Sequence, residues 1–236
     1  MRLDIFLMQN NFTKSRNKAL ELIKNGFIKV DNNIILKPSF FVSSKSSVEI
    51  LKKEIFVSRA GEKLDFYVKE NNINFNELDV LDIGSSKGGF TQVLLKYGAK
   101  SVTCVDVGVN QLDETLRKDS RVKVYESCDI RNFKSEYIFD FAVCDVSFIS
   151  LNNILDSIYK LTKGESILLF KPQFEVGKEA RRNKKGVVLQ EEIINKTLDS
   201  FIKYIKSSGF SVKNISKSSL KGKEGNEEIF INIKKQ

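Results

Sequence analysis

Histidine is absent from this chain of 236 residues. It is the commonest general base, the commonest metal ligand, and the usual partner of serine and cysteine nucleophiles. Its absence therefore excludes those types of active site. Any acid–base chemistry must use Lys, Asp, Glu, Tyr or Cys side chains.

Cysteine is scarce as well. Cys104, Cys128 and Cys144 lie in apolar, strand-like runs, and no C-x-x-C spacing occurs. An odd number of cysteines without metal-site spacing predicts neither disulfides nor a zinc site. We interpret the three as core thiols and expect no bound metal.

Long apolar runs are also lacking. None approaches the ~20 residues that a membrane-spanning helix needs, and the first residues, MRLDIFLMQNNF, are too polar for a signal peptide. We therefore expect a cytoplasmic protein without a membrane partner. The 41% apolar content is enough for one domain of ordinary size and a small one.

The net charge of +9 is unevenly spread. Residues 1–63 contain 12 Lys/Arg and 6 Asp/Glu, a surplus of 6, which leaves 3 for the rest of the chain. A basic segment of this kind indicates a polyanionic partner such as RNA. A lysine-rich composition from an A/T-biased genome remains an alternative.

Residues 1–50 have a pattern of their own. A short helix starting at Leu3, a helix over residues 15–25 stopped by Gly26, and a hairpin over residues 27–36 are predicted, with later strand positions that include Phe40 and Val42. This order resembles the alpha-L RNA-binding module, the type found in ribosomal protein S4. The candidate RNA-binding cations are Arg2, Lys14, Arg16, Lys18, Lys29 and Lys37. A helical hairpin with a solvated charged face is the alternative.

After a charged connector at residues 52–58, strand-like and helix-like runs alternate. We predict an RNA-binding domain at residues 1–58 and a second domain at 59–236. The expected strands are residues 80–83, 102–105, 122–125, 139–144 and 166–170. The expected helices are residues 90–96, 111–118, 151–161 and 191–207. The last two strand-like runs, residues 211–215 and 228–233, are expected to pair antiparallel. The alternation predicts an α/β fold, a Rossmann-like doubly wound, mostly parallel sheet with an antiparallel last strand, preceded by a small α+β domain.

The run VLDIGSSKGGF, residues 80–90, is a strand that ends in a glycine-rich turn before a helix. Such turns let a ligand approach the backbone. Dinucleotide sites use G-x-G-x-x-G, whereas three other residues separate Gly84 from Gly88 here. The wider form resembles the S-adenosylmethionine motif of Rossmann-like methyltransferases. The residues expected to hold this cofactor are Asp82, Gly84, Ser85, Ser86, Gly88, Gly89 and Phe90. Plain helix packing is the alternative for such a turn.

Carboxylates follow the next strands. Asp106, after the second strand, is expected to bind the cofactor's ribose diol, and Asp129, after the third, to lie near its adenine. Exposed loop aspartates are the alternative. Lys171 follows the fifth strand, beside Asp145 after the fourth, so both are expected at the edge where ligands bind in such sheets. A lysine in that cleft can be catalytic.

The segments SRAGEKL, LDIGSSKGGFTQVLL, VDVG, FDFAVCDVSFISL and LLFKPQFEVGK occur in an order that resembles the TlyA family, often labelled hemolysin A. The resemblance covers essentially the whole chain and implies an FtsJ-like methyltransferase domain. It also implies a catalytic tetrad of Lys63, Asp145, Lys171 and Glu228. Glu227 would replace Glu228 if the strand register were shifted by one residue. Residues 109–110 and 128–129 depart from the family pattern and put cofactor contacts there in doubt.

What the resemblance implies is methyl transfer from S-adenosylmethionine to a cytidine 2′-hydroxyl of ribosomal RNA, with the start at RLD favouring the large subunit. The basic segments 171–185, with Lys178, Arg181 and Arg182, and 213–223 are expected to contact RNA backbone or, alternatively, to be solvated loops. Two other functions stay open. These are a non-catalytic RNA-binding or ribosome-assembly protein, and a membrane-active hemolysin, for which the sequence contains no amphipathic or spanning segment.

Overall fold

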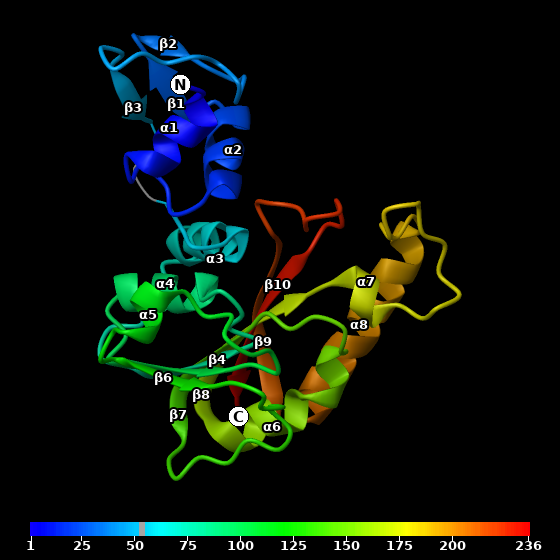
Figure 1. Cartoon of the computed structure of the whole chain (residues 1–236). Helices are drawn as coiled ribbons and strands as arrows, with labels where there is room; N and C mark the ends of the chain where they lie inside the picture. The colour runs from blue at the N-terminus through cyan, green and yellow to red at the C-terminus, as the bar shows by residue number, and fades with distance from the viewer. Residues whose placement is uncertain (52–54) are drawn as a thin grey trace. The chain divides into compact units, whose positions relative to one another are not determined.

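The computed structural model describes residues 1–51 and 55–236 and divides the chain into two compact units, Met1–Ile55 and Phe56–Gln236 (Figure 1). Residues 52–54 of the predicted connector lie outside the described residues. Phe56 is buried in the core of the second unit. The division at residues 58 and 59 stays a prediction.

The first unit combines two helices with a small antiparallel sheet in the order β2-β1-β3. Its elements are α1 (Leu3–Gln9), α2 (Arg16–Lys24), β1 (Ile28–Val30), β2 (Asn33–Ile34) and β3 (Val48–Ile50). The Ser15 hydroxyl accepts the backbone N–H of Lys18 at the start of α2, and Gly26, at φ +73°, follows its end. The predicted helices and hairpin of this unit are therefore present.

Phe40 and Val42 were predicted in strands, and this was wrong. Both lie outside the strands, and their backbones bond to the beginning of the chain. The N–H of Leu3 donates to the Phe40 carbonyl at 2.7 Å, and the N–H of Val42 donates to the Met1 carbonyl at 2.8 Å. These bonds satisfy backbone groups that a sheet ladder would otherwise pair.

The second unit is built on a seven-stranded sheet in the order β6-β5-β4-β7-β8-β10-β9. Its strands are β4 (Asp79–Ile83), β5 (Ser101–Val105), β6 (Val122–Tyr125), β7 (Phe139–Cys144), β8 (Thr162–Phe170), β9 (Phe210–Lys217) and β10 (Ile229–Lys235). Neighbours from β6 to β8 are parallel, whereas β10 runs antiparallel to both β8 and β9. The predicted fold class is confirmed.

The helices of this unit are α3 (Arg59–Glu70), α4 (Gly89–Lys96), α5 (Glu114–Arg117), η1 (Leu151–Asn153), α6 (Leu155–Leu161), α7 (Pro172–Glu175) and α8 (Glu191–Ser207). Two are shorter than predicted. The Asp113 carboxylate caps α5 by accepting the N–H of Thr115, so the helix starts there and not at Gln111. The helix expected over residues 151–161 is divided into η1 and α6, with the Ser150 hydroxyl capping η1.

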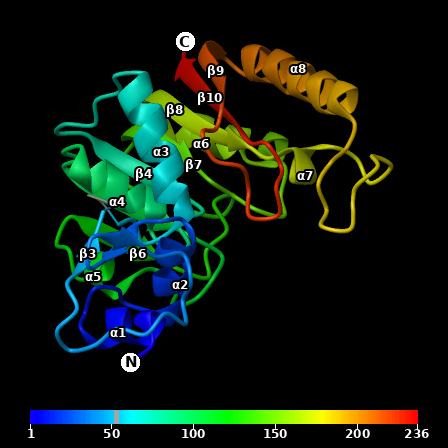
Figure 2. The ribbon, with the colours of Figure 1, turned by 90° about the horizontal axis from the view of Figure 1, so that it is seen from above.

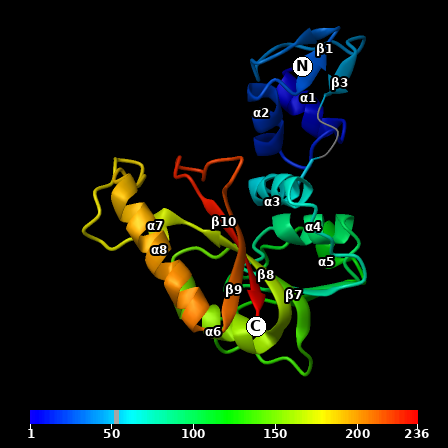
Figure 3. The same cartoon turned by 180° about the vertical axis from the view of Figure 1, so that it is seen from behind.

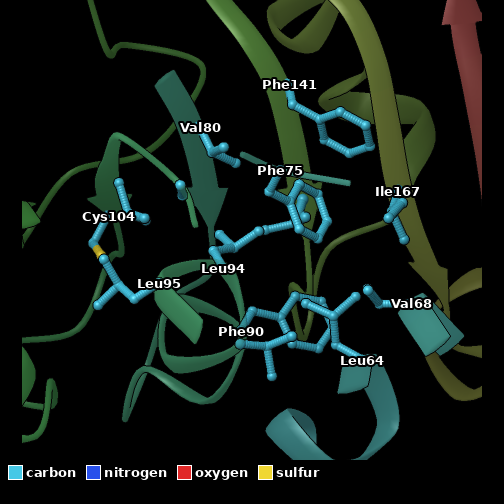
Figure 4. Close-up of a cluster of buried hydrophobic side chains, with 14 of the residues drawn as sticks. Leu64, Val68, Phe75, Val80, Phe90, Leu94, Leu95, Cys104, Phe141 and Ile167 are labelled. Atoms are coloured by element: carbon cyan, nitrogen blue, oxygen red, sulfur yellow. The ribbon is translucent and has the colours of Figure 1, made fainter. Parts of the chain in front are cut away.

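Helices cover both faces of the sheet, with α3 and α4 on one side and α6 and α8 on the other (Figure 2). On the first side, Phe230 of β10 stacks on Tyr67 of α3 at 4.4 Å and lies 6.3 Å from the Phe90 ring of α4. Phe75 meets Phe141 edge to face at 5.1 Å (Figure 4). This aromatic core fixes α3 and α4 on the sheet. Among the described residues no helix is long and apolar enough to span a bilayer.

The helices α3 and α4 approach closely where two glycines meet. A Cβ atom on Gly89 would lie 2.7 Å from the backbone nitrogen of Gly61 and would collide with the Ser58 hydroxyl. A Cβ on Gly61 would lie 2.9 Å from the Gly89 carbonyl oxygen. Neither position has room for a side chain.

We predict that Gly89→Ala lowers the free energy of unfolding by about 1–3 kcal/mol, because the added methyl group forces backbone apart. Urea denaturation measures the change. Gly177→Ala is the matched control, since its methyl group would meet only the end of the flexible Glu179 side chain. Equal midpoints for Gly89→Ala and wild type would contradict the packing argument.

Candidate active site

The glycine turn follows β4 and starts α4. Gly84 and Gly88 have φ values of +78° and +88°, which favour glycine. A Cβ on Gly84 would also lie 2.8 Å from the backbone oxygen of Asp145, after the neighbouring strand. Ser85 is buried, and the Ser86 hydroxyl donates to Gln111. Gly89 and Phe90, by contrast, serve packing between helices and core.

Asp82 lies at the base of this turn and is fully buried. Its Oδ2 atom accepts a 2.6 Å hydrogen bond from the Thr91 hydroxyl, whereas Oδ1 has no partner within the described chain. Burial is the largest cause that raises the pKa of Asp82 to about 7, and the charges of Asp145 and Asp106 add to it. An unpaired buried carboxylate oxygen is costly unless a donor meets it.

Asp106 follows β5 and joins two loops. Its carboxylate accepts the N–H groups of Ser86 at 2.8 Å and Gly108 at 2.7 Å. Each oxygen keeps capacity for a second hydrogen bond. Asp129, after β6, forms a two-pronged ion pair with Arg131, which lowers the pKa of that carboxyl. The Asp129 carboxylate is thus engaged in its own loop.

Two ion pairs lie at the carboxyl edge of the sheet, one buried and one partly buried. The Lys63 ammonium of α3 donates to Glu228 Oε2 at 2.6 Å, and both side chains are less than a tenth exposed. Lys171 Nζ lies 2.6 Å from Asp145 Oδ1 and donates to the Ser147 hydroxyl at 3.1 Å. The two pairs join residues that are far apart in the sequence.

Strand register explains why the two ion pairs lie on the same face at the same edge of the sheet. Ile229 pairs with Phe170 across β10 and β8, so Glu228 and Lys171 are the next residues beyond this pair. Side chains alternate between faces. Lys171 therefore returns to the face of Leu169, and Glu228 to that of Phe230, which both pack under α3 and α4.

The same alternation holds for β7. Val143 belongs to the core under α3 and α4 and Cys144 to the opposite core, so Asp145 again faces α3 and α4. All four residues of the expected tetrad lie on this face. Glu227 points elsewhere, since it is exposed and pairs with Lys217 and Lys221. The register favours Glu228.

Aromatic rings lie beside Lys171. The Phe174 ring is 6.0 Å from Lys171 Nζ, and the Phe148 ring is 5.0 Å from that of Phe174. Phe148 is 91% exposed and has a φ of +65°. Sequence reasoning missed Ser147 and Phe148, although both follow Asp145 within three residues. The Phe148 and Phe174 rings together form an aromatic pair beside Lys171, which is a candidate surface for stacking a planar ligand.

The expected RNA-binding cations differ in their partners. Arg2 and Arg16 both donate to the buried carboxylate of Asp4, and the bond from Arg2 is the largest cause that lowers the pKa of Asp4 to about 2. Lys18 pairs with Glu21. Exposed cations include Lys14 and Lys37 in the first unit and Lys178 and Arg181 in the second, and Lys29 is half-buried.

Arg182 has a different place. Its guanidinium donates to four backbone carbonyl groups of its own loop, those of Val176, Gly177, Lys178 and Ala180. A guanidinium has five N–H donors. Arg182 therefore shapes the loop more than it offers charge to a ligand.

Comparisons with known proteins show the families to which the two units are similar. The chain matches the FtsJ-like methyltransferase family over residues 56–235 and the S4 domain over residues 1–48. It is 45% identical to "23S rRNA (cytidine-2'-O)-methyltransferase TlyA" of Campylobacter jejuni, with 98% of each chain covered. It is 37% identical to "Hemolysin A" of Brachyspira hyodysenteriae, with 99% of each covered. The solved structure of a protein described as a hemolysin from Streptococcus thermophilus has a TM-score of 0.75 and 34% identity, covering 100% of this chain and 88% of that one.

We predict that Lys63→Met and Glu228→Gln each lower the free energy of unfolding by about 3–5 kcal/mol, because each leaves one buried charge unpaired. The double variant is expected to lose less than the sum of the two. Urea denaturation of the four proteins measures the coupling. Additive losses of unfolding free energy would show that Lys63 and Glu228 are not coupled.

The raised pKa of Asp82 predicts a pH dependence. The pKa of an unfolded aspartate is about 3.9, whereas that of folded Asp82 is about 7. The protonated form of Asp82 therefore makes its full contribution to stability below about pH 4. This contribution is lost as the pH rises to about 7. Asp82→Asn removes this loss and is expected to gain roughly 4 kcal/mol over wild type at pH 8.

Urea denaturation from pH 4 to 8 without cofactor tests this expectation. Asp199→Asn, at an exposed position of α8, is the control. A difference in unfolding free energy between the wild type and Asp82→Asn that stays constant over this pH range would contradict it.

Proposed function

This chain belongs to the TlyA family of FtsJ-like methyltransferases that carry an S4 domain, and from this we propose that it methylates a cytidine ribose 2′-hydroxyl in ribosomal RNA. The observation that carries the proposal is that two ion pairs, Lys171–Asp145 and Lys63–Glu228, lie at one edge of the sheet. A ribose hydroxyl is a poor nucleophile and needs a group that orients or deprotonates it.

The methyl donor we propose is S-adenosylmethionine. The chain fits it in two respects. Asp82 Oδ1 is buried beside the glycine turn and has no partner among the described residues, and Asp106 retains acceptor capacity for a ribose diol. Ser86 and the turn would line the same site. When bound, this cofactor supplies an electrophilic methyl group on a positively charged sulfur.

We assign Lys171 to hold the 2′-oxygen. The Lys171 ammonium donates to the Ser147 hydroxyl and is ion-paired with Asp145, and its remaining N–H donors can meet a substrate oxygen. The Asp145 carboxylate would accept the hydroxyl proton, while the bound donor would give up its methyl group to the 2′-oxygen and leave as a neutral thioether. Lys63 and Glu228 keep the edge of the sheet and its charges in place. Positioning of this kind accounts for much of the rate of such transfers.

The target nucleotide has to leave its stack to reach this edge. The exposed Phe148 ring, with Phe174 between it and Lys171, offers a surface on which an unstacked base can lie. The S4 domain would bind structured RNA. The name of the Campylobacter relative favours large-subunit RNA as the substrate, and such a substrate would place the protein in the cytoplasm.

We predict that Lys171→Ala lowers the rate of methyl transfer about 10²–10⁴-fold, because the 2′-oxygen loses its orienting donor. Radiolabelled transfer to ribosomal RNA from cells lacking the gene measures the rate. Lys203→Ala, at an exposed position of α8, is the matched control and should keep the wild-type rate.

Binding of S-adenosylmethionine by Lys171→Ala, measured by calorimetry, separates lost chemistry from lost folding. Full transfer by Lys171→Ala would overturn the assignment of this lysine. Absence of transfer by the wild type to large-subunit RNA, small-subunit RNA and intact subunits would overturn the function.

A further inference from the structure

Two basic loops lie beside the proposed active site. The first basic loop, residues 176–190, leads from α7 to α8 and contains five Lys/Arg and one Glu. The second basic loop, residues 218–227 between β9 and β10, is named for Lys221 and Lys223 and also contains Glu224 and Glu227. Both loops emerge at the same end of the sheet, where β8 ends and β10 begins (Figure 3). Their exposed cations are Lys178, Arg181, Lys184, Lys185, Lys221 and Lys223, of which Lys221 pairs with Glu227 of its own loop.

Asn226 joins these loops. It is only 4% exposed, and its Oδ1 atom accepts the N–H of Val188 at 3.0 Å. Its Nδ2 group donates to the Gly186 carbonyl at 3.3 Å. Both ends of the Asn226 amide therefore bind the backbone of the first basic loop. A buried amide satisfied in this way fixes the two chains relative to each other.

The second basic loop also surrounds Glu228. A Cβ atom on Gly222 would lie 2.6 Å from Glu228 Oε1, and the Gly222 N–H donates to the Asn226 carbonyl at 2.8 Å. Arg59, at the start of α3, donates to the Lys221 carbonyl at 2.9 Å. The loop is thus tied at once to α3, to Glu228 and, through Asn226, to the first basic loop.

The first basic loop has internal order of its own. Arg182 binds its carbonyl groups, and the Asn183 side chain accepts the N–H groups of Lys185 at 2.8 Å and Val187 at 3.0 Å. This order holds residues 183–187 as one turn, and Asn226 binds that turn at Gly186 and the adjoining Val188.

We propose that Asn226 is a positioning residue that unites the two basic loops into one phosphate-binding wall and aligns it with Glu228. The proposal rests on the proposed function, since the partner is the RNA substrate. Lysine and arginine side chains along such a wall bind RNA backbone without reading its sequence. Asn226 determines where that backbone lies relative to the 2′-hydroxyl at Lys171.

The test compares Asn226→Asp, which keeps the shape but loses the donor to Gly186, with Asn226→Ala. Asn195→Asp, at an exposed position of α8, adds the same charge and is the control. We expect both Asn226 variants to raise KM for ribosomal RNA about tenfold with kcat within about twofold, because substrate positioning weakens while the tetrad remains. Asn195→Asp should match the wild type.

A second measurement reports how often the first basic loop opens. Trypsin should cut after Arg181, Lys184 or Lys185 about tenfold faster in both Asn226 variants, since a freed loop opens more often. This readout does not depend on methyl transfer. Unchanged KM together with unchanged cleavage would overturn the proposal, whereas a wild type that transfers no methyl group would overturn the proposed function and leave the cleavage rates to judge the loop coupling.

A double-mutant cycle guards against a general loss of stability. If Asn226 acts by placing the wall, Lys185→Ala should raise KM less in the Asn226→Asp protein than in the wild type. Additive effects on KM would contradict coupling between Asn226 and the first basic loop, even where each variant is impaired.

Discussion

The candidate site depends on the buried ion pair between Lys63 and Glu228. It connects the first helix of the second unit, α3, to the residue before its last strand, β10, across 165 positions of sequence. Neither charge can be buried without the other except at high cost. α3 also packs closely on α4 where Gly61 meets Gly89, and Lys63 lies two residues after Gly61. A packing constraint on two glycines therefore helps to position one partner of the ion pair.

The antiparallel β10 has a particular role in this arrangement. Parallel strands bring only their carboxyl ends to the ligand edge, which accounts for Asp145 and Lys171. A strand inserted in the opposite direction brings its beginning there instead, and so Glu228 arrives beside Lys171. The reversal also puts the loop before β10 at the same edge. One change of strand direction therefore adds both an acidic side chain and a loop with two exposed lysines to the site.

Local pattern in the sequence was sufficient for much of the fold. Apolar runs located the strands, and polar residues at their ends located Asp106, Asp145 and Lys171. The local pattern was insufficient where the structure depends on a contact between residues that are distant in the sequence. The choice between Glu227 and Glu228 depends on register with β8, and the role of Gly89 depends on Gly61 in another helix. The shortening of α5 is different, because the capping residue Asp113 was visible in the sequence.

Charge composition proves a poor measure of the charge that a ligand meets. Arg2 and Arg16 share the carboxylate of Asp4, whose low pKa of about 2 keeps it ionised at any physiological pH. Arg182 is directed to backbone carbonyls. These guanidinium groups already donate to partners within the protein and offer fewer free N–H groups to a phosphate. The net charge of +9 therefore overstates the number of mobile cations, and the salt dependence of RNA binding should be governed by the few exposed side chains on ordered loops.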